Sequence, residues 1–282
     1  MTRSARYVGD RRIVVGDADP VPPGPGQVRI DVAYTGICGT DLHIMHGAMD
    51  RRVHTPAVIG HEMSGRIAAL GAGVTDHAVG DPVTVMPLDW CGNCPACHAG
   101  HTHICHRLNF VGIDSAGSMQ HSWTVPARIL VPLPADLPLR RAALIEPTAV
   151  AVHDVRRSRL TAGERSVVIG AGPVGLLIAK VAQTTGATVT VVEIDPDRRA
   201  VAVSFAGAGA NSAVAGSDAW PRRAAAWAGT GATVAGTHAA VGRLFGWDVH
   251  RVGGGACQAG GTGPVQHAVK RGSGFAIRAA IG

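Results

Sequence analysis

The sequence lacks any apolar run long enough to span a membrane. Its first residues, MTRSARYVGDRRIVV, also lack the long apolar core of a secretory signal peptide. We therefore expect a cytoplasmic protein without a membrane partner. In that reducing compartment, closely spaced cysteines favour metal binding over disulfide formation.

The body of the chain also lacks a basic stripe with interleaved aromatic residues, the pattern of many nucleic-acid-binding surfaces. The net charge is +6, but residues 1–210 contain 19 basic and 18 acidic side chains. The basic excess comes from residues 211–282, which contain seven basic and two acidic side chains. This distribution argues against a nucleic-acid partner.

Residues 211–282 lack a legible alternation of strands and helices. They contain 15 glycines and three of the five tryptophans, but only one leucine. We expect this segment to be an atypical tail. It is a divergent ending, a disordered segment or the product of a shifted reading frame, and the composition favours the last two.

The rest of the chain shows two patterns, and 282 residues suffice for two domains with cores. Residues 1–155 are β-rich, with helical spacing on either side of Pro147 near their end. Their strand signals are QVRIDVAY, SGRIAAL, DPVTVMP and SWTVPARILVPLP. Residues 156–210 then run from a strand (RSVVIGAG) through a helix (PVGLLIAKVAQTTGA) to a second strand (TVTVVEID). This order predicts the first β-α-β part of a dinucleotide-binding domain.

The glycine turn between that strand and helix has the G-x-G-x-x-G spacing. Its motif, GAGPVG, contains Gly170, Gly172, Pro173, Val174 and Gly175. Gly170 permits the turn, Gly172 lets the backbone approach a pyrophosphate, and Gly175 allows close packing of the helix. The amino end of the helix offers free N–H groups to phosphate.

An acidic residue, Glu193, ends the second strand, 18 positions after Gly175. Its carboxylate can accept hydrogen bonds from a ribose diol and would repel a 2′-phosphate, so the sequence favours NAD over NADP. NADP stays an alternative cofactor, because Arg198 and Arg199 could reach a 2′-phosphate.

Four cysteines form a second motif at Cys91, Cys94, Cys97 and Cys105. Four thiolates fill a tetrahedral shell and leave no place for water or substrate, so this spacing predicts a structural zinc site in a lobe over residues 91–105. The histidines between and beside these cysteines are interpreted as solvated loop residues.

A third pattern is dispersed: GICGTDLHI contains Cys38, GHEMSG contains His61, and LIEPTAV contains Glu146. One thiolate, one imidazole and one carboxylate could converge on a metal and leave a fourth position open, as in catalytic zinc sites. The spacing leaves plainer alternatives open. His61 could be a satisfied loop histidine, and Glu146 could be an acid at a helix amino end.

Four motifs, taken in their order along the chain, resemble the zinc-dependent medium-chain alcohol and polyol dehydrogenases. They are GICGTDLHI, GHEMSG, the four-cysteine loop and GAGPVG. The resemblance covers roughly residues 10–210. It implies an α/β plus β architecture, with a GroES-like catalytic domain followed by a Rossmann-type doubly wound domain that is incomplete here.

The same resemblance implies roles for the site residues. Cys38, His61 and Glu146 would bind a catalytic zinc ion, and Glu62 would be a neighbouring or transient partner of that ion. Asp41 would orient His61. Thr40 and His43 match proton-relay positions, and the four lobe cysteines would hold the second zinc ion.

A glutamate at position 146, where the best-known alcohol dehydrogenases have cysteine, resembles sorbitol and 2,3-butanediol dehydrogenases. The segments CGTDLHI and GHTHIC also resemble threonine dehydrogenases. The implied function is hydride transfer from a diol, polyol or amino alcohol to NAD, in a chain that could form homo-oligomers. Two alternatives stay open: a zinc-binding remnant without catalysis, and a regulatory or binding protein on the same scaffold.

Overall fold

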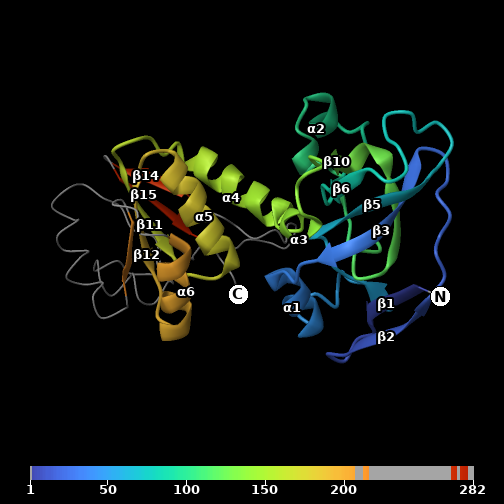
Figure 1. Ribbon diagram of the computed structural model, residues 1–282, viewed down its shortest axis with the longest axis horizontal. Helices are drawn as coiled ribbons and strands as arrows, with labels where there is room; N and C mark the ends of the chain where they lie inside the picture. Colours follow the sequence, from blue (N-terminus) through green and yellow to red (C-terminus); the bar gives the residue numbers. More distant parts are fainter. Residues whose placement is uncertain (1, 207–211, 216–267, 272–273, 279–282) are drawn as a thin grey trace. The chain divides into compact units, whose positions relative to one another are not determined.

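A computed structural model describes residues 2–206, 212–215, 268–271 and 274–278 (Figure 1). The chain divides into a first unit that ends at Glu146 and a second unit that begins at Pro147. This division falls in the first turn of helix α4 (Ile145–Ser158), whereas the sequence pattern places the end of the first domain at residue 155.

The first unit is built around a five-stranded antiparallel sheet with the order β10-β6-β5-β3-β9. Apolar side chains alternate along its strands, so that Val28 and Ile30 of β3 point into a core shared with Met63 and Trp123. The strands predicted from the sequence are confirmed. They are β3 (Gln27–Thr35), β5 (Met63–Leu70), β6 (Pro82–Val85), β9 (Ser122–Pro126) and β10 (Leu130–Pro132).

Smaller elements complete this unit (Figure 1). A three-stranded sheet has the order β2-β1-β4, and a two-stranded sheet pairs β7 with β8. Its strands are β1 (Thr2–Tyr7), β2 (Ile13–Ala18), β4 (Ala57–Val58), β7 (Leu88–Asp89) and β8 (Asn109–Phe110). Its helices are α1 (Gly39–Met45), α2 (Pro95–His98) and α3 (Leu139–Ala142), with 3-10 turns at Thr102–Ile104 and Ala127–Ile129.

The helical spacing around Pro147 is also confirmed, since α3 and α4 lie on either side of Leu144. Pro147 itself is in the first turn of α4. A proline is tolerated there because the first N–H groups of a helix have no partner within the helix.

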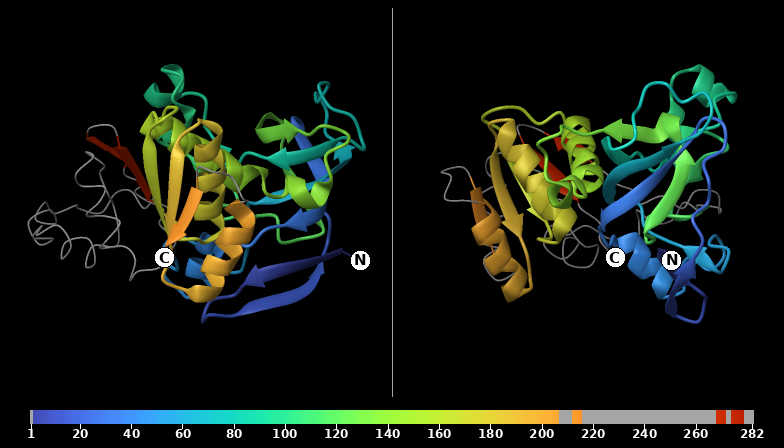
Figure 2. Two further views of the ribbon diagram at one scale, coloured as in Figure 1. Left: turned by 60° about the vertical axis from the view of Figure 1, so that its left-hand side comes forward. Right: turned by 45° about the vertical axis from the view of Figure 1, so that its right-hand side comes forward.

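The second unit contains the predicted β-α-β order. Strand β11 (Arg165–Ile169) leads through α5 (Pro173–Thr184) to β12 (Thr188–Val192), and the two strands pair in parallel. Helix α5, yellow in both views of Figure 2, packs on these strands through Ile178, Ala179 and Ala182. Helix α6 (Pro196–Ala206) follows β12.

The sheet of this unit has the order β13-β12-β11-β15-β14. Its further strands are β13 (Ser212–Ala215), β14 (Ala268–Arg271) and β15 (Gly274–Arg278). Strands β13, β12, β11 and β15 are parallel neighbours, and β14 is antiparallel to β15. The order of the parallel strands is that of the first half of a doubly wound nucleotide fold, which confirms the predicted fold class.

The atypical tail predicted for residues 211–282 lies largely outside the described residues, and so does Cys257. Where this segment is described, it forms β13, β14 and β15, so the expectation that it lacks strands is wrong for these residues. Within the described part of the chain, no helix combines the length and apolarity needed to cross a membrane.

Candidate metal and nucleotide sites

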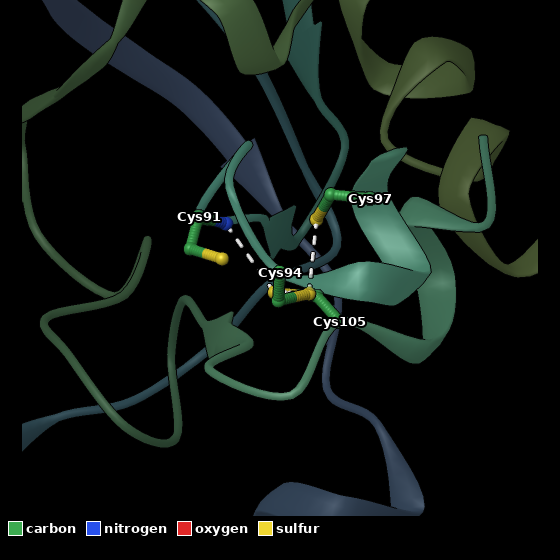
Figure 3. Close-up of side chains that lie close together, drawn as sticks. All are labelled: Cys91, Cys94, Cys97 and Cys105. Carbon is green, nitrogen blue, oxygen red and sulfur yellow. Dashed lines mark hydrogen bonds between the residues drawn. The ribbon is translucent and has the colours of Figure 1, made fainter. Parts of the chain in front are cut away.

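Two groups of potential metal ligands occur in the described part of the chain, and the first is the four-cysteine lobe (Figure 3). The sulfur atoms of Cys91, Cys94, Cys97 and Cys105 all lie within 4.8 Å of one another. Sγ of Cys94 is 3.5 Å from Sγ of Cys97 and 3.9 Å from Sγ of Cys105. In a tetrahedron with zinc–sulfur bonds of about 2.3 Å, sulfur atoms are about 3.8 Å apart. The four thiols therefore fit a closed zinc site.

Backbone N–H groups of the lobe point at these sulfur atoms. His106 N donates to Cys94 Sγ at 3.4 Å, and Cys91 N and Arg107 N each donate to Cys105 Sγ at 3.3 Å. The His106 N–H is the largest influence that holds the pKa of Cys94 below its usual value. Such donors stabilise the thiolate, the form that binds zinc.

The lobe histidines are not part of this group. His98, His101, His103 and His106 are all exposed, and the ligand atoms that come together are four sulfurs. The interpretation of these histidines as solvated is confirmed, but His98 ends α2 and His103 lies in the 3-10 turn Thr102–Ile104, so these two are not loop residues.

The second group joins Cys38, His61 and Glu62, whose ligand atoms lie within 4.8 Å of one another. Cys38 directly precedes α1, while His61 and Glu62 directly precede β5. His61 and Glu62 are 3% and 8% exposed. The backbone brings the two segments together, because Gly36 N donates to Glu62 O at 2.6 Å.

Neighbouring residues of α1 hold Cys38. Thr40 donates hydrogen bonds to its sulfur, and Cys38 N donates to Asp41 Oδ2 at 2.9 Å. Asp41 also accepts from the backbone N–H of Gly60, so it links the two segments that carry Cys38 and His61.

The predicted orienting contact between Asp41 and His61 is not formed in this structure. Asp41 Oδ1 and His61 Nδ1 are both buried without a hydrogen-bond partner. A buried imidazole nitrogen that has no partner is costly unless a ligand satisfies it. A metal ion fits this requirement.

The pKa values of the second group also favour a bound metal ion. Burial raises the pKa of Cys38 to about 11 and that of Asp41 to about 6, and it lowers the pKa of His61 to about 4. Burial also raises the pKa of Glu62. Each shift disfavours the charged form. A divalent cation would supply the positive charge that thiolate and carboxylates need at such depth.

Glu146 lies near this group but outside the 4.8 Å set. Burial, followed by the negative charges of Glu62 and Asp41, raises its pKa to about 7. The structure thus brings Glu62 closest to Cys38 and His61. The assignment of Glu146 as the third zinc ligand stays a prediction.

The glycine turn has the predicted form in the second unit. Gly170 has a φ of +97°, a conformation that L side chains rarely adopt. A Cβ atom on Gly175 would collide with the carbonyl oxygen of Gly170, so only glycine permits this approach of α5 to the turn. Gly172 is the residue before α5, and Pro173 and Val174 form its first turn.

Glu193 is 6% exposed and closes this turn from the end of β12. Its Oε2 accepts from Ala171 N at 2.7 Å, and its Oε1 accepts from Ile194 N at 2.8 Å and Asp195 N at 3.0 Å. Burial raises the pKa of Glu193, but these three backbone donors outweigh it and leave that pKa below its usual value.

Known proteins resemble this chain in both sequence and fold. Residues 24–135 match the alcohol dehydrogenase GroES-like domain. The chain is 30% identical to galactitol-1-phosphate dehydrogenase from Escherichia coli, with a TM-score of 0.75 over 85% of this chain and 70% of that one. The chain belongs to the zinc-type medium-chain alcohol and polyol dehydrogenase family.

Other members of this family are also similar. A 2-dehydro-3-deoxy-L-galactonate 5-dehydrogenase from Pseudoalteromonas atlantica is 54% identical over 196 residues, which are 70% of this chain and 58% of that relative. The chain therefore spans little more than half of that protein. A zinc-binding dehydrogenase from Sinorhizobium meliloti, solved with NADP bound, is 31% identical, with a TM-score of 0.72 over 78% of this chain and 63% of that one.

Two residues next to the Cys38–His61 group were given no role by the sequence patterns. Phe110 packs against His61, with ring centroids 5.2 Å apart, and a Cβ atom on Gly36 would collide with the Glu62 carboxylate. Gly36 is the first residue of GICGTDLHI, two positions before Cys38, so the motif contained this signal. Phe110 is 49 positions after His61, and no spacing rule connects them.

Proposed function

We propose that this chain belongs to an oxidoreductase that transfers a hydride from a secondary alcohol to NAD with the help of zinc. The observation that carries the proposal is the pair of distinct metal-ligand groups in one unit. The four lobe cysteines would close around a structural zinc ion. Cys38, His61 and a carboxylate would leave a position for substrate.

The ligands proposed for the catalytic zinc ion are Cys38, His61 and Glu146, with Glu62 as a neighbouring or exchanging ligand. Two observations support a cation at the Cys38–His61 group. The Nδ1 atom of His61 has no hydrogen-bond partner, and burial raises the pKa values of Cys38 and Glu146. When bound, zinc would polarise the alcohol oxygen and favour loss of its proton. Asp41 would hold the two ligand segments together through Cys38 N and Gly60 N.

Thr40 and His43 are proposed to move the proton away from the substrate. They are three residues apart on α1 and so lie on neighbouring positions of one helix face. The Thr40 hydroxyl already contacts the Cys38 sulfur. Histidine suits the solvent end of such a path, because its charge changes near neutral pH. An unchanged pH–rate profile in a His43→Ala variant would remove His43 from this path.

NAD is proposed to bind at the glycine turn that contains Gly170, Gly172 and Gly175. Three backbone donors use only part of the acceptor capacity of Glu193, which leaves room for a ribose hydroxyl. The same carboxylate would repel the 2′-phosphate of NADP. Arg199 is committed to the carbonyl oxygens of Glu193 and Ile194, at 3.2 and 2.7 Å, which also disfavours a role in binding that phosphate.

The proposed substrate is a small polyhydroxylated molecule. The similarity to a 2-dehydro-3-deoxy-L-galactonate 5-dehydrogenase favours a sugar acid that is oxidised at a secondary hydroxyl group. Diols, polyols and amino alcohols such as threonine are the other candidates.

The test combines zinc content with NADH formation in the purified chain. Two zinc ions per chain, and NADH formed with 2-dehydro-3-deoxy-L-galactonate, are the expected results. 2,3-Butanediol, sorbitol and threonine are the comparison substrates, and NADP is the comparison cofactor. Zinc without nucleotide binding or turnover would overturn the proposal in favour of a zinc-binding remnant.

We also propose a cytoplasmic location, because the five described cysteines are free thiols that suit a reducing compartment. Formation of homo-oligomers stays a prediction that light scattering of the purified chain would test.

A further inference from the structure

The orientation of the His61 ring depends on packing. Its Nδ1 is buried and makes no hydrogen bond, so that atom is available to a metal ion and contacts of the ring itself set its orientation. The nearest described ring is that of Phe110. Its centroid lies 5.2 Å from the centroid of the imidazole, and the two planes are at 86°. This edge-to-face contact is specific in geometry and can define a ring orientation.

Asp114 fixes the position of Phe110. Phe110 N donates to Asp114 Oδ2 at 2.9 Å, and Asp114 N donates back to Phe110 O at 2.8 Å. These reciprocal bonds close a tight turn directly after β8. The backbone that carries the Phe110 ring is therefore held by the Asp114 carboxylate.

Arg52 in turn holds Asp114. Its Nε and Nη2 reach the two carboxylate oxygens at 2.7 Å each, in a bidentate pair. The side chains of the pair are 34% and 25% exposed, so its contribution to overall stability is expected to be small. Its geometry is nevertheless specific, because a guanidinium fork fixes both oxygens of a carboxylate at once.

The same loop also holds the backbone next to His61. Ser118 N donates to Gly60 O at 2.8 Å. A Cβ atom on Gly112 or Gly117 would collide with that carbonyl oxygen, so glycine is required for the approach. The segment from Phe110 to Ser118 thus contacts both the ring of His61 and the residue before it.

We propose that Asp114 and Arg52 are positioning residues for the metal centre. They hold Phe110 against His61 and thereby set the affinity of the Cys38–His61 group for its metal ion. This inference rests on the proposed function, which places a metal ion at that group.

The test uses the full chain, stripped of metal and titrated with Co²⁺, whose visible absorption reports ligand geometry. The four-cysteine site serves as an internal reference in every variant. Asp114→Ala and Phe110→Leu are expected to weaken Co²⁺ binding at the Cys38–His61 group about tenfold and to change its absorption bands, the size of effect typical for groups that orient a metal ligand.

Conservative variants and a matched control separate positioning from general damage. Phe110→Tyr keeps the ring and should retain the wild-type spectrum, and Arg52→Lys should bind Co²⁺ more tightly than Arg52→Met. Arg128→Met removes another Arg–Asp pair of the same unit, with Asp89, and should leave Co²⁺ binding unchanged.

Two results would overturn different claims. If the wild-type chain binds two Co²⁺ ions and folded Asp114→Ala and Phe110→Leu variants bind both with unchanged affinity and spectrum, the inference is wrong and the proposed function stands. If the wild-type chain binds Co²⁺ only at the four cysteines, the proposed function fails, and the inference fails with it.

Discussion

The carboxylate of Glu193 accepts a hydrogen bond from the backbone N–H of Ala171 at 2.7 Å and so ties the end of β12 to the glycine turn after β11. Two further backbone donors, Ile194 N and Asp195 N, contact the other oxygen of this carboxylate. A residue expected to contact cofactor therefore also holds the loop on which that cofactor would lie.

This contact predicts a pH dependence of stability. The pKa of Glu193 is lower in the folded chain than its ordinary value near 4.5. Its stabilising contribution is therefore complete above that value and is lost as the pH falls through the lowered folded pKa. In Glu193→Gln, urea unfolding followed from about pH 7 to about pH 3 should show a smaller acid-induced loss of stability.

The size of the effect follows from the hydrogen bonds lost. Each bond to the charged carboxylate contributes about 2 kcal/mol, so Glu193→Gln should lower the unfolding free energy at neutral pH by at least that amount. Glu164→Gln is the matched control, because Glu164 accepts one backbone N–H, from Thr161, in the same unit. Equal losses in the two variants would contradict a special role for Glu193.

The lobe cysteines yield a second prediction. Cys97→Ser replaces one of four thiolate ligands with a hydroxyl, a poor zinc ligand, and should lower zinc content from two ions to one per chain after dialysis against a chelator. Elemental analysis measures this directly. His101→Ala is the control, because His101 is exposed in the same lobe. Retention of both ions by Cys97→Ser would show that the four sulfurs do not form the site.

A third prediction concerns Glu62. In Gly36→Ala the new methyl group would push the Glu62 carboxylate away from Cys38 and His61. If Glu62 binds or orients the metal ion, zinc affinity at this group should fall about tenfold.

Gly16→Ala provides the matched control for that experiment. Gly16 lies in β2, its Cβ position is open, and its backbone does not have a positive φ. Competition with a chromophoric chelator compares the two variants. Wild-type zinc affinity in a folded Gly36→Ala variant would leave Glu62 without a role at the metal.

Much of this account could be predicted from local sequence patterns. The alternating strands of the first unit, the β-α-β order and the four-cysteine lobe all depend on residues close together in the chain, where spacing determines geometry. In β3, the alternation of side chains along the sequence predicts a strand. At the turn, Gly170 has a positive φ, which favours glycine.

The remainder depends on contacts between distant segments. The bidentate pair of Arg52 and Asp114 joins residues 62 positions apart, and no spacing rule predicts it. The proximity of Glu62 to Cys38 also emerges only when the segments before α1 and β5 pack together. Likewise, the backbone partners of Glu193 depend on how β12 meets the glycine turn, so the sequence suggested its ribose contact but not its structural one.

The central claim is that Cys38 belongs to a catalytic metal group separate from the lobe. Its most direct test is zinc content and NADH formation in a Cys38→Ala variant, with His103→Ala as the control from the exposed lobe histidines. The account predicts one zinc ion per chain and no turnover in Cys38→Ala, against two ions and full turnover in the control. Two zinc ions and wild-type turnover in Cys38→Ala would contradict it.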